Sequence, residues 1–523
     1  DKPNLVQGAL RAITIFMETL TNNELSNVVG TLWPALHHIL IENRYDDQVR
    51  ATSIRVFHKC IIAPEESGDR NATMKLLATL RESLAPWMKS ILEILHKFPA
   101  KDTILDFLRN KPSNRLSGFL IHAMCVKIAL ALLRLHPELF QPYKSFFFNS
   151  LCKLGADVLP IFDRLVICGG KDASRLFDED GEQMDLQAFL ADVIDFIGLC
   201  VRTEINKISP KVSSVLTNLA MGYMKITRHE QEDWLRDPNN FITYDDDILT
   251  IKTVRASAIG LIGDLSSSGS VGVQSIVEQA GRRLEVSRAL KGKNDSNWWK
   301  ELEVCMYSMG INAGSLSDRK ARIKFLQLAV LPVLRNADSY HPILSSRAIW
   351  CITQYMEAME SSEDICKISF QAVAKSLEAK KAPILRWVAS RTLGYICAGN
   401  FSTNVLQRLV NMTLPNLCQL YSGATGISVV MALQTLMFAM NVSEDLAAHA
   451  VPQIIPVLIK LWGRNHNDHS VIEDINRLIV DLAINKKCTD KVLRAVLPPM
   501  VSVIEKACKS EAAAVIGTAS RAL

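Results

Sequence analysis

The sequence lacks an unbroken apolar run of about 18 residues, the shortest length that usually lets a helix cross a bilayer. Its longest apolar stretch, from Ile121 to Leu135, is interrupted by a histidine, a lysine and an arginine. The first residues, Asp1 to Asn4, do not resemble the start of a secretory signal peptide. We therefore expect a chain that does not insert into a membrane.

Cysteine pairs at metal-binding or redox spacing are also missing. The 12 cysteines include no Cys-x-x-Cys pair, and most lie among leucine, isoleucine and alanine. Free cysteine behaves as a small buried hydrophobe, which predicts a reducing compartment without disulfides. His466 and His469 form a close histidine pair, but no further ligands lie near them in the sequence. A polar turn between helices is the preferred interpretation, so no metal is expected.

Motifs for catalysis are absent as well. The sequence has no nucleophile elbow, no zinc-protease helix motif and no glycine-rich dinucleotide loop. We expect neither catalytic residues nor a cofactor. The net charge of +5 is modest for 523 residues, and the lysines and arginines are dispersed. Direct binding of nucleic acid is therefore not expected, because it requires a clustered basic surface.

Helical periodicity dominates what the sequence does contain. Between Leu186 and Ile197, the apolar residues recur at i, i+3, i+4, i+7, i+8 and i+11, which places them on one face of a helix. The same pattern fits residues 5–20, 121–135, 212–224, 323–334 and 472–484. Sustained strand alternation is absent, and this combination predicts an all-α protein.

Prolines inside apolar helices recur at a regular interval. Pro332, Pro415, Pro456 and Pro498 are separated by 83, 41 and 42 residues. The first interval is two periods, and the helix between them, near residues 372–377, has no proline. A period of about 40–47 residues with two helices in each unit is typical of HEAT and armadillo repeats. Similar segments surround Pro34, Pro86 and Pro160 at looser spacing.

The second helix of several units begins with an arginine next to small or apolar residues. Examples are Val49-Arg50-Ala51, Val254-Arg255 and Leu385-Arg386. We expect these arginines to reach carbonyls or an acidic residue at a neighbouring turn. At this period, residues 1–523 predict one continuous superhelical solenoid of about twelve antiparallel helix pairs.

Two acidic or irregular insertions interrupt the predicted helices, near residues 169–185 and 235–250. In the first, placing Gly181 at position 6 of a calcium loop puts Leu176 and Gln187 where Asp and Glu are required, so an EF-hand is excluded. The second contains an Asp-Pro-Asn-Asn turn from Asp237 and then three aspartates. It is either a solvated loop or an acidic insertion that attracts a basic partner.

Four groups of residues resemble the importin-β (karyopherin) superfamily, most closely the importin-nine type of histone carrier. Residues 234–258 combine a tryptophan, Asp-Pro-x-x-Phe, an acidic run and Val-Arg-Ala-Ser-Ala, as in the acidic-loop repeat of this family. Residues 297–300, Asn-Trp-Trp-Lys, followed by Glu303 to Met306 and Gly310, resemble its Trp-Trp-Lys helix. Residues 202–204, Arg-Thr-Glu, follow the first acidic insertion and resemble a third family segment in reversed order, and residues 347–350 resemble another family helix. The match is collinear from about Leu5 to Leu497, and by this comparison the chain corresponds to an internal portion of such a receptor.

The resemblance implies a nuclear import receptor that shuttles between cytoplasm and nucleus. Its implied partners are the Ran GTPase in its GTP form, a basic cargo such as core histones, and phenylalanine-glycine nucleoporins. The implied contacts to Ran or cargo are Tyr244, Asp245, Asp246 and Asp247, with Asp178, Glu179, Asp180 and Glu182 as a second acidic group.

The repeats alone leave another function open. A HEAT scaffold unrelated to transport, such as a phosphatase scaffold, a chromosome-organising subunit or a tubulin-binding array, fits the period equally well. That alternative predicts that the acidic insertion is dispensable and that Ran has no effect on binding. An enzyme is the third possibility, and the missing motifs disfavour it.

Overall fold

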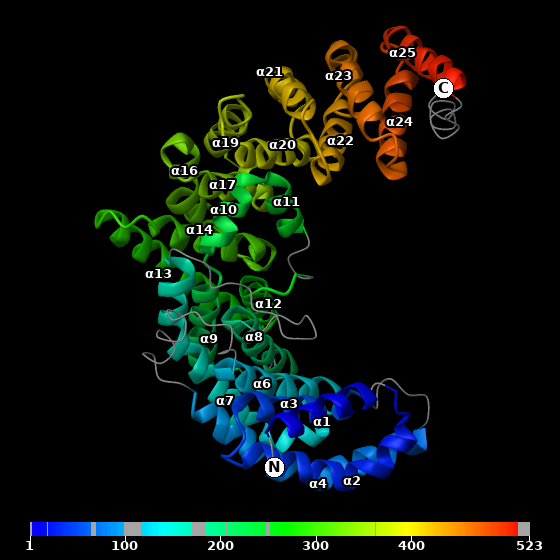
Figure 1. Ribbon diagram of the computed structural model, residues 1–523. Helices are drawn as coiled ribbons and strands as arrows, with labels where there is room; N and C mark the ends of the chain where they lie inside the picture. Colours follow the sequence, from blue (N-terminus) through cyan, green and yellow to red (C-terminus); the bar gives the residue numbers. More distant parts are fainter. Residues whose placement is uncertain are drawn as a thin grey trace. The chain divides into compact units, whose positions relative to one another are not determined.

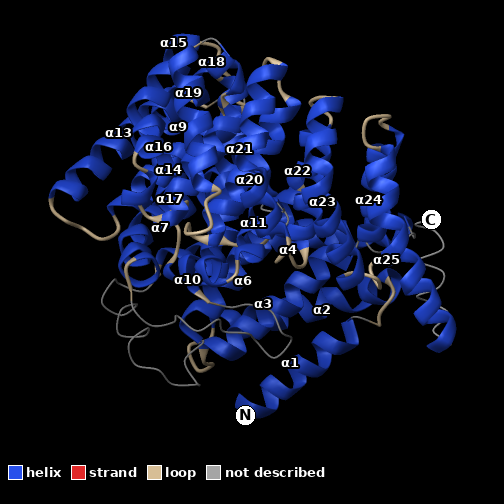
Figure 2. Ribbon diagram, turned by 90° about the horizontal axis from the view of Figure 1, so that it is seen from above, coloured by secondary structure: helices blue, strands red, loops and turns tan. Residues whose placement is uncertain are grey.

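The computed structural model describes residues 3–17, 19–63, 70–98, 117–169, 185–204, 208–246, 251–360 and 362–510. Every regular element in these ranges is a helix, and short turns join them (Figure 2). The predicted fold class, an all-α HEAT-type array, is confirmed. By their contacts the residues divide into two compact units: unit 1 contains residues 1–228 and 249–279, and unit 2 contains residues 229–248 and 280–523. A single continuous array over 1–523 stays a prediction.

Unit 1 has two layers of helices. One layer stacks α1 (Pro3–Met17), α3 (Asp47–Ile62), α6 (Ser117–Leu135), α8 (Leu186–Thr203) and α12 (Val254–Ser266) in order. The other stacks α2 (Asn22–Ile41), α4 (Arg70–His96), α7 (Pro137–Phe162) and α9 (Pro210–Tyr223). The two layers also pack on each other, through α2 on α3, α7 on α8 and α9 on α12, as a solenoid of helix pairs requires.

Unit 2 repeats this arrangement (Figure 1). Its A layer contains α16 (Leu331–Arg335), α19 (Glu363–Ser376), α21 (Thr403–Tyr421), α23 (Glu444–Arg464) and α25 (Thr489–Ser510). Its B layer contains α14 (Trp298–Ile311), α17 (Pro342–Gln354), α20 (Pro383–Ala398), α22 (Ile427–Met440) and α24 (His469–Ile484). Connecting elements are α13 (Ser270–Gly292), α15 (Arg319–Phe325) and α18 (Met356–Glu360).

The periodic prolines lie in the A layer, as the spacing predicts. Pro332 is in α16, Pro415 in α21, Pro456 in α23 and Pro498 in α25, and α19 is the intervening helix without one. Proline removes a backbone donor, so Pro415, Pro456 and Pro498 each cost the interior of their helix one hydrogen bond. Pro332 stands in the first turn of α16, where a backbone donor has no partner within the helix.

The arginines of the second helices bind backbone carbonyls of neighbouring helices, as expected. Arg50 Nε donates to the Leu40 oxygen at 2.8 Å. Arg386 donates from Nε to the oxygen of Leu377 and from Nη2 to that of Asn416, both at 3.3 Å. The carbonyls at a helix C-terminus have no partner within their own helix. The arginines thus satisfy carbonyls at the ends of α2 and α19 and, through Asn416 of α21, join neighbouring helices.

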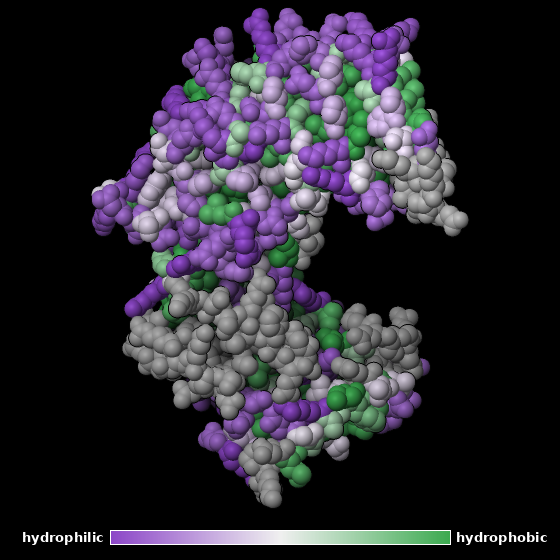
Figure 3. Space-filling model, turned by 45° about the horizontal axis from the view of Figure 1, so that its top comes forward, coloured by the Kyte–Doolittle hydropathy of each residue, from purple (hydrophilic) through white to green (hydrophobic). Residues whose placement is uncertain are grey.

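One described helix, α23, is long and apolar enough to cross a membrane by length and composition alone. It is 56% buried over its most apolar window and packs on α21, α22, α24 and α25. A helix buried among four others in this way has the environment of a core helix. The surface around the later helices is mostly hydrophilic on the face turned to the viewer, with small apolar patches (Figure 3).

Candidate functional site

The second predicted insertion folds as two short helices in unit 2. They are α10 (Arg228–Arg236) and α11 (Pro238–Asp246), separated by Asp237. The turn chemistry is present at that break, because Asp237 Oδ1 accepts the backbone N–H of Asn239 at 2.9 Å. The expectation that the residues after it depart from helix is wrong. Proline is favoured at the first position of a helix, and Pro238 begins α11 in this way.

An aromatic cluster holds the two helices together. The Trp234 ring contacts the rings of Phe241 and Tyr244, with centroids 5.2 and 5.0 Å apart. All three side chains are buried. The structure therefore places Tyr244 inside the α10–α11 pair, whereas the family resemblance places it beside the partner-binding acids.

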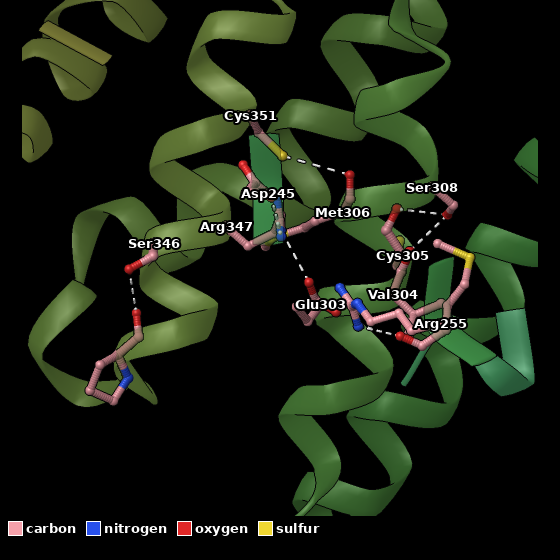
Figure 4. Close-up of polar contacts among 12 residues, drawn as sticks. Asp245, Arg255, Glu303, Val304, Cys305, Met306, Ser308, Ser346, Arg347 and Cys351 are labelled. Carbon is pink, nitrogen blue, oxygen red and sulfur yellow. Dashed lines mark hydrogen bonds and ion pairs between the residues drawn. The ribbon is translucent and has the colours of Figure 1, made fainter. Parts of the chain in front are cut away.

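Asp245 forms part of a buried charge cluster centred on Arg347 of α17 (Figure 4). Both terminal guanidinium nitrogens of Arg347 donate to Asp245 Oδ1 at 3.2 Å, and its Nε donates to Glu303 Oε1 at 3.0 Å. The side chains of Arg347 and Glu303 are 2% and 0% exposed, and that of Asp245 is 10% exposed. The guanidinium also lies 4.0 Å from the centre of the Tyr307 ring. Asp245 is therefore an internal ion-pair partner.

Of the two aspartates in the last turn of α11, Asp246 has the more exposed side chain. Its carboxylate accepts a hydrogen bond from Arg391 Nη2 at 2.5 Å, and its side chain is 40% exposed. Asn239, at the other end of α11, accepts the backbone N–H of Ser428 at 3.2 Å. Contacts at both ends thus hold α11 on the B-layer helices α17, α20 and α22.

A cavity of about 550 Å³ lies beside α11 within unit 2. Its walls come from α11, α17, α18, α20 and α22. Trp350, Val388 and Tyr395 form much of its apolar lining, and Asp246 and Arg391 contribute charge. Tyr395 is 48% exposed, so this lining reaches solvent. The cavity and the docked α11 together form the candidate site.

The other predicted acidic contacts lie outside the described residues. These are Asp247, Asp178, Glu179, Asp180 and Glu182. Sequence reasoning missed Arg391 altogether, and it noted Glu303 and Arg347 only as parts of family helices. Arg347 lies 102 residues from Asp245 in the chain, and Arg391 lies 145 residues from Asp246. No local sequence pattern could therefore predict these pairs.

The expected polar turn at the histidine pair is confirmed. Asp468 caps α24 by accepting the N–H of Val471 at 3.2 Å, and His466 contacts the Gly463 carbonyl. No group of three or more possible metal ligands occurs among the residues that the structure describes. The cysteines are mostly buried, and burial raises the pKa of the Cys60 thiol to about 12. Such a thiol stays protonated and unreactive.

The adjacent tryptophans divide between surface and core, as two neighbouring helix positions normally do. Trp299 is buried and stacks on His341 at 3.9 Å between ring centres, while Trp298 lies under the Lys291 ammonium at 4.6 Å. His341 Nδ1 accepts the N–H of Ile343 and so caps α17. Burial, with repulsion from Lys300, lowers the pKa of His341 from 6.5 to about 4.

We expect the stability of unit 2 to fall as the pH is lowered from 6.5 towards 4. In that window the unfolded chain binds a proton at His341 that the folded chain does not, whereas above pH 6.5 the contribution is fully present. The loss is about 1–3 kcal/mol. His341→Asn keeps a capping oxygen and should lose less on acidification. Urea unfolding of both proteins at pH 7.5 and 5 measures this, and equal pH dependence would contradict the assignment.

The chain is similar to known proteins over nearly its whole length. No protein-family model matches it. Importin-9 of Drosophila melanogaster is 24% identical over 521 residues, which is 95% of this chain and 48% of that protein. The structure of Lph2, a bidirectional nuclear transport receptor in S. cerevisiae, superimposes with a TM-score of 0.65 and 13% identity, covering 96% of this chain and 52% of that one. The structure of the karyopherin Kap121p bound to the SUMO protease Ulp1p superimposes with a TM-score of 0.55 and 13% identity. The match covers 100% of this chain and 43% of that one.

By these structural likenesses, the chain is a helical solenoid with the karyopherin fold. The resemblance to the importin-β superfamily, and within it to the importin-nine type, is confirmed by the collinear match to Importin-9. The chain spans about half the length of the relatives that it matches.

Proposed function

We propose that this chain is the part of a nuclear import receptor that binds basic protein cargo and responds to the Ran GTPase. The observation that carries the proposal is the collinear similarity to Importin-9 over 95% of the chain. The relatives are named as transport receptors, not as enzymes. The proposal includes movement between cytoplasm and nucleus, a cargo such as core histones, and contacts to phenylalanine-glycine nucleoporins.

The proposed contacts to Ran or cargo are the acidic residues at the end of α11 and in the first insertion. Asp246 has the best access of those described, because its carboxylate is 40% exposed. A basic partner can compete with Arg391 for it, since an exposed ion pair contributes only about 0–1 kcal/mol. Asp245 is held more firmly by Arg347. Asp247, Asp178, Glu179, Asp180 and Glu182 complete the proposed acidic set.

The experiment is a pull-down of the full-length protein with Ran loaded with GTP or GDP, with and without a core-histone heterodimer, at physiological salt. We expect retention of Ran in the GTP state only. Asp245→Asn, Asp246→Asn and Asp247→Asn together should weaken retention of Ran or histone several-fold, because the acidic charge proposed to attract a basic surface is lost.

The matched control is Asp445→Asn, which removes another exposed aspartate of unit 2 from its 2.7 Å pair with Lys487. Its binding should equal that of the unchanged protein. Absence of Ran binding in both nucleotide states would refute the transport function and favour the scaffold alternative. Equal effects of the triple and control variants would remove α11 from the binding surface.

A further inference from the structure

The segment from His229 to Ile248 leaves the unit to which its neighbours in sequence belong. Residues 1–228 and 249–279 belong to unit 1, yet this segment makes its contacts in unit 2. Its helix α11 lies against α20 and α22 and forms ion pairs with α17 and α20. A helix inserted in this way occupies a surface formed by other repeats.

Helix α11 is poorly suited to stand alone. It has nine residues, whereas isolated helices shorter than about 12–15 residues are marginal in water. Its last turn contains Asp245 and Asp246 and no basic residue. Carboxylates at this end of a helix are unfavourable because the C-terminus carries partial negative charge. Docking on Arg347 and Arg391 therefore supplies the compensation that the helix itself lacks.

If α11 undocks, the surface beneath it keeps no unpaired buried charge. Arg347 is held by two carboxylates, and the 3.0 Å bond to Glu303 does not involve α11. When Asp245 departs to solvent, a neutral Arg347–Glu303 pair remains. A buried arginine with a single partner would instead be strongly destabilised by the loss of that partner.

Space beside α11 also shows that the helix fills its binding surface incompletely. The cavity of about 550 Å³ continues from α11 along Trp350 and Val388 to the half-exposed Tyr395. A groove of this size lies within the usual range for ligand sites, about 300–1,000 Å³. Its charged anchors are two arginines, and its present occupant supplies Phe241, Ile242 and two aspartates.

We propose that α11 is an internal occupant of a peptide-binding groove on α17, α20 and α22, and that an acidic, aromatic helical segment of a partner protein takes its place. The arginines select carboxylates, and the cavity accepts an aromatic or branched side chain. Such a partner differs in charge from the basic cargo of the proposed function, and its binding is tested without Ran or cargo.

The test uses a fluorescent peptide with the sequence of residues 237–246, measured by fluorescence anisotropy. The unchanged protein should bind it weakly because α11 competes. Asp245→Asn with Asp246→Asn in the protein keeps the side-chain shapes but removes both ion pairs. We expect this variant to bind the peptide at least tenfold more tightly, since apparent affinity rises with the fraction of open groove. Adding Arg391→Glu should reverse the gain.

Controls separate this mechanism from general charge effects. Asp445→Asn should bind the peptide as weakly as the unchanged protein, and a peptide with asparagine at both aspartate positions should not bind. Hydrogen exchange of residues 238–246 reports whether α11 is released. If it stays protected in the double variant, a second variant replaces His229–Ile248 with a glycine-serine linker of equal length.

The linker variant decides the outcome whatever the first variant does. A folded linker variant that binds the acidic peptide, and not its asparagine form, supports the proposal. A folded linker variant that binds neither peptide, or both equally, overturns it. A linker variant that does not fold also overturns it, because α11 would then be part of the core of unit 2.

Discussion

Arg347→Met is expected to lower the free energy of unfolding of unit 2 by about 3–5 kcal/mol, the usual loss when one partner of a buried ion pair is removed. Glu303 and Asp245 would then face each other with side chains 0% and 10% exposed and without the guanidinium between them. The methionine keeps apolar contact with Tyr307 and Trp350, so the charge is the main loss. The shift of the urea unfolding midpoint measures the effect.

Arg391→Met is the matched control. It removes the same type of side chain from α20, but its pair with Asp246 is 23% and 40% exposed on the two sides. Exposed pairs contribute about 0–1 kcal/mol. Adding Glu303→Gln to Arg347→Met should restore part of the lost stability, because it removes one of the two facing charges. Equal losses of unfolding free energy for Arg347→Met and Arg391→Met would show that the buried cluster contributes no more to stability than the exposed pair.

Arg347→Met should also release α11 from the surface on which it docks. Hydrogen exchange of residues 238–246 should become faster in Arg347→Met than in the control, because α11 loses its buried anchor while the contacts of Asn239 and Asp246 remain. Unchanged protection of α11 would mean that the aromatic contacts of Trp234 and Phe241 are sufficient to hold it. The two measurements therefore separate global stability from local docking.

Features set by a single repeat could be predicted from the sequence. The helix positions follow from apolar periodicity, and the proline interval identified the A-layer helices that the structure shows. The expected role of Arg50 and Arg386 is also local, since each binds a carbonyl 9–30 residues away. Such contacts repeat with the period, so one pattern describes them all.

The candidate site could be predicted only in part. The Asp-Pro-Asn-Asn run correctly marks a turn, and Pro238 is compatible with the start of a helix. A nine-residue helix needs docking to be stable, and the sequence does not show that docking. Asp245 was chosen as an acid that faces a partner, whereas it pairs with Arg347 at a separation of 102 residues. Contacts between distant repeats leave no periodic trace in a single sequence.

Trp87→Ala is expected to destabilise unit 1 by about 3–5 kcal/mol, the range for removing a large aromatic from a packed core. Trp87 of α4 stacks on Phe57 of α3 at 3.9 Å between ring centres, and Trp33 of α2 meets Phe57 edge-on at 5.5 Å. All three are at most 1% exposed. The cluster joins three consecutive helices, so its loss should unfold them together.

Phe146→Ala in α7 of the same unit is the control, because that ring is 63% exposed and its removal should change stability by less than about 0.5 kcal/mol. Repeat arrays transmit stability mainly between neighbours. Hydrogen exchange in Trp87→Ala should therefore rise in α2, α3 and α4 and stay unchanged in α11 and α17. An equal rise at α11 would show that the two units unfold as one, and α11 would then report on global stability as well as on its own docking.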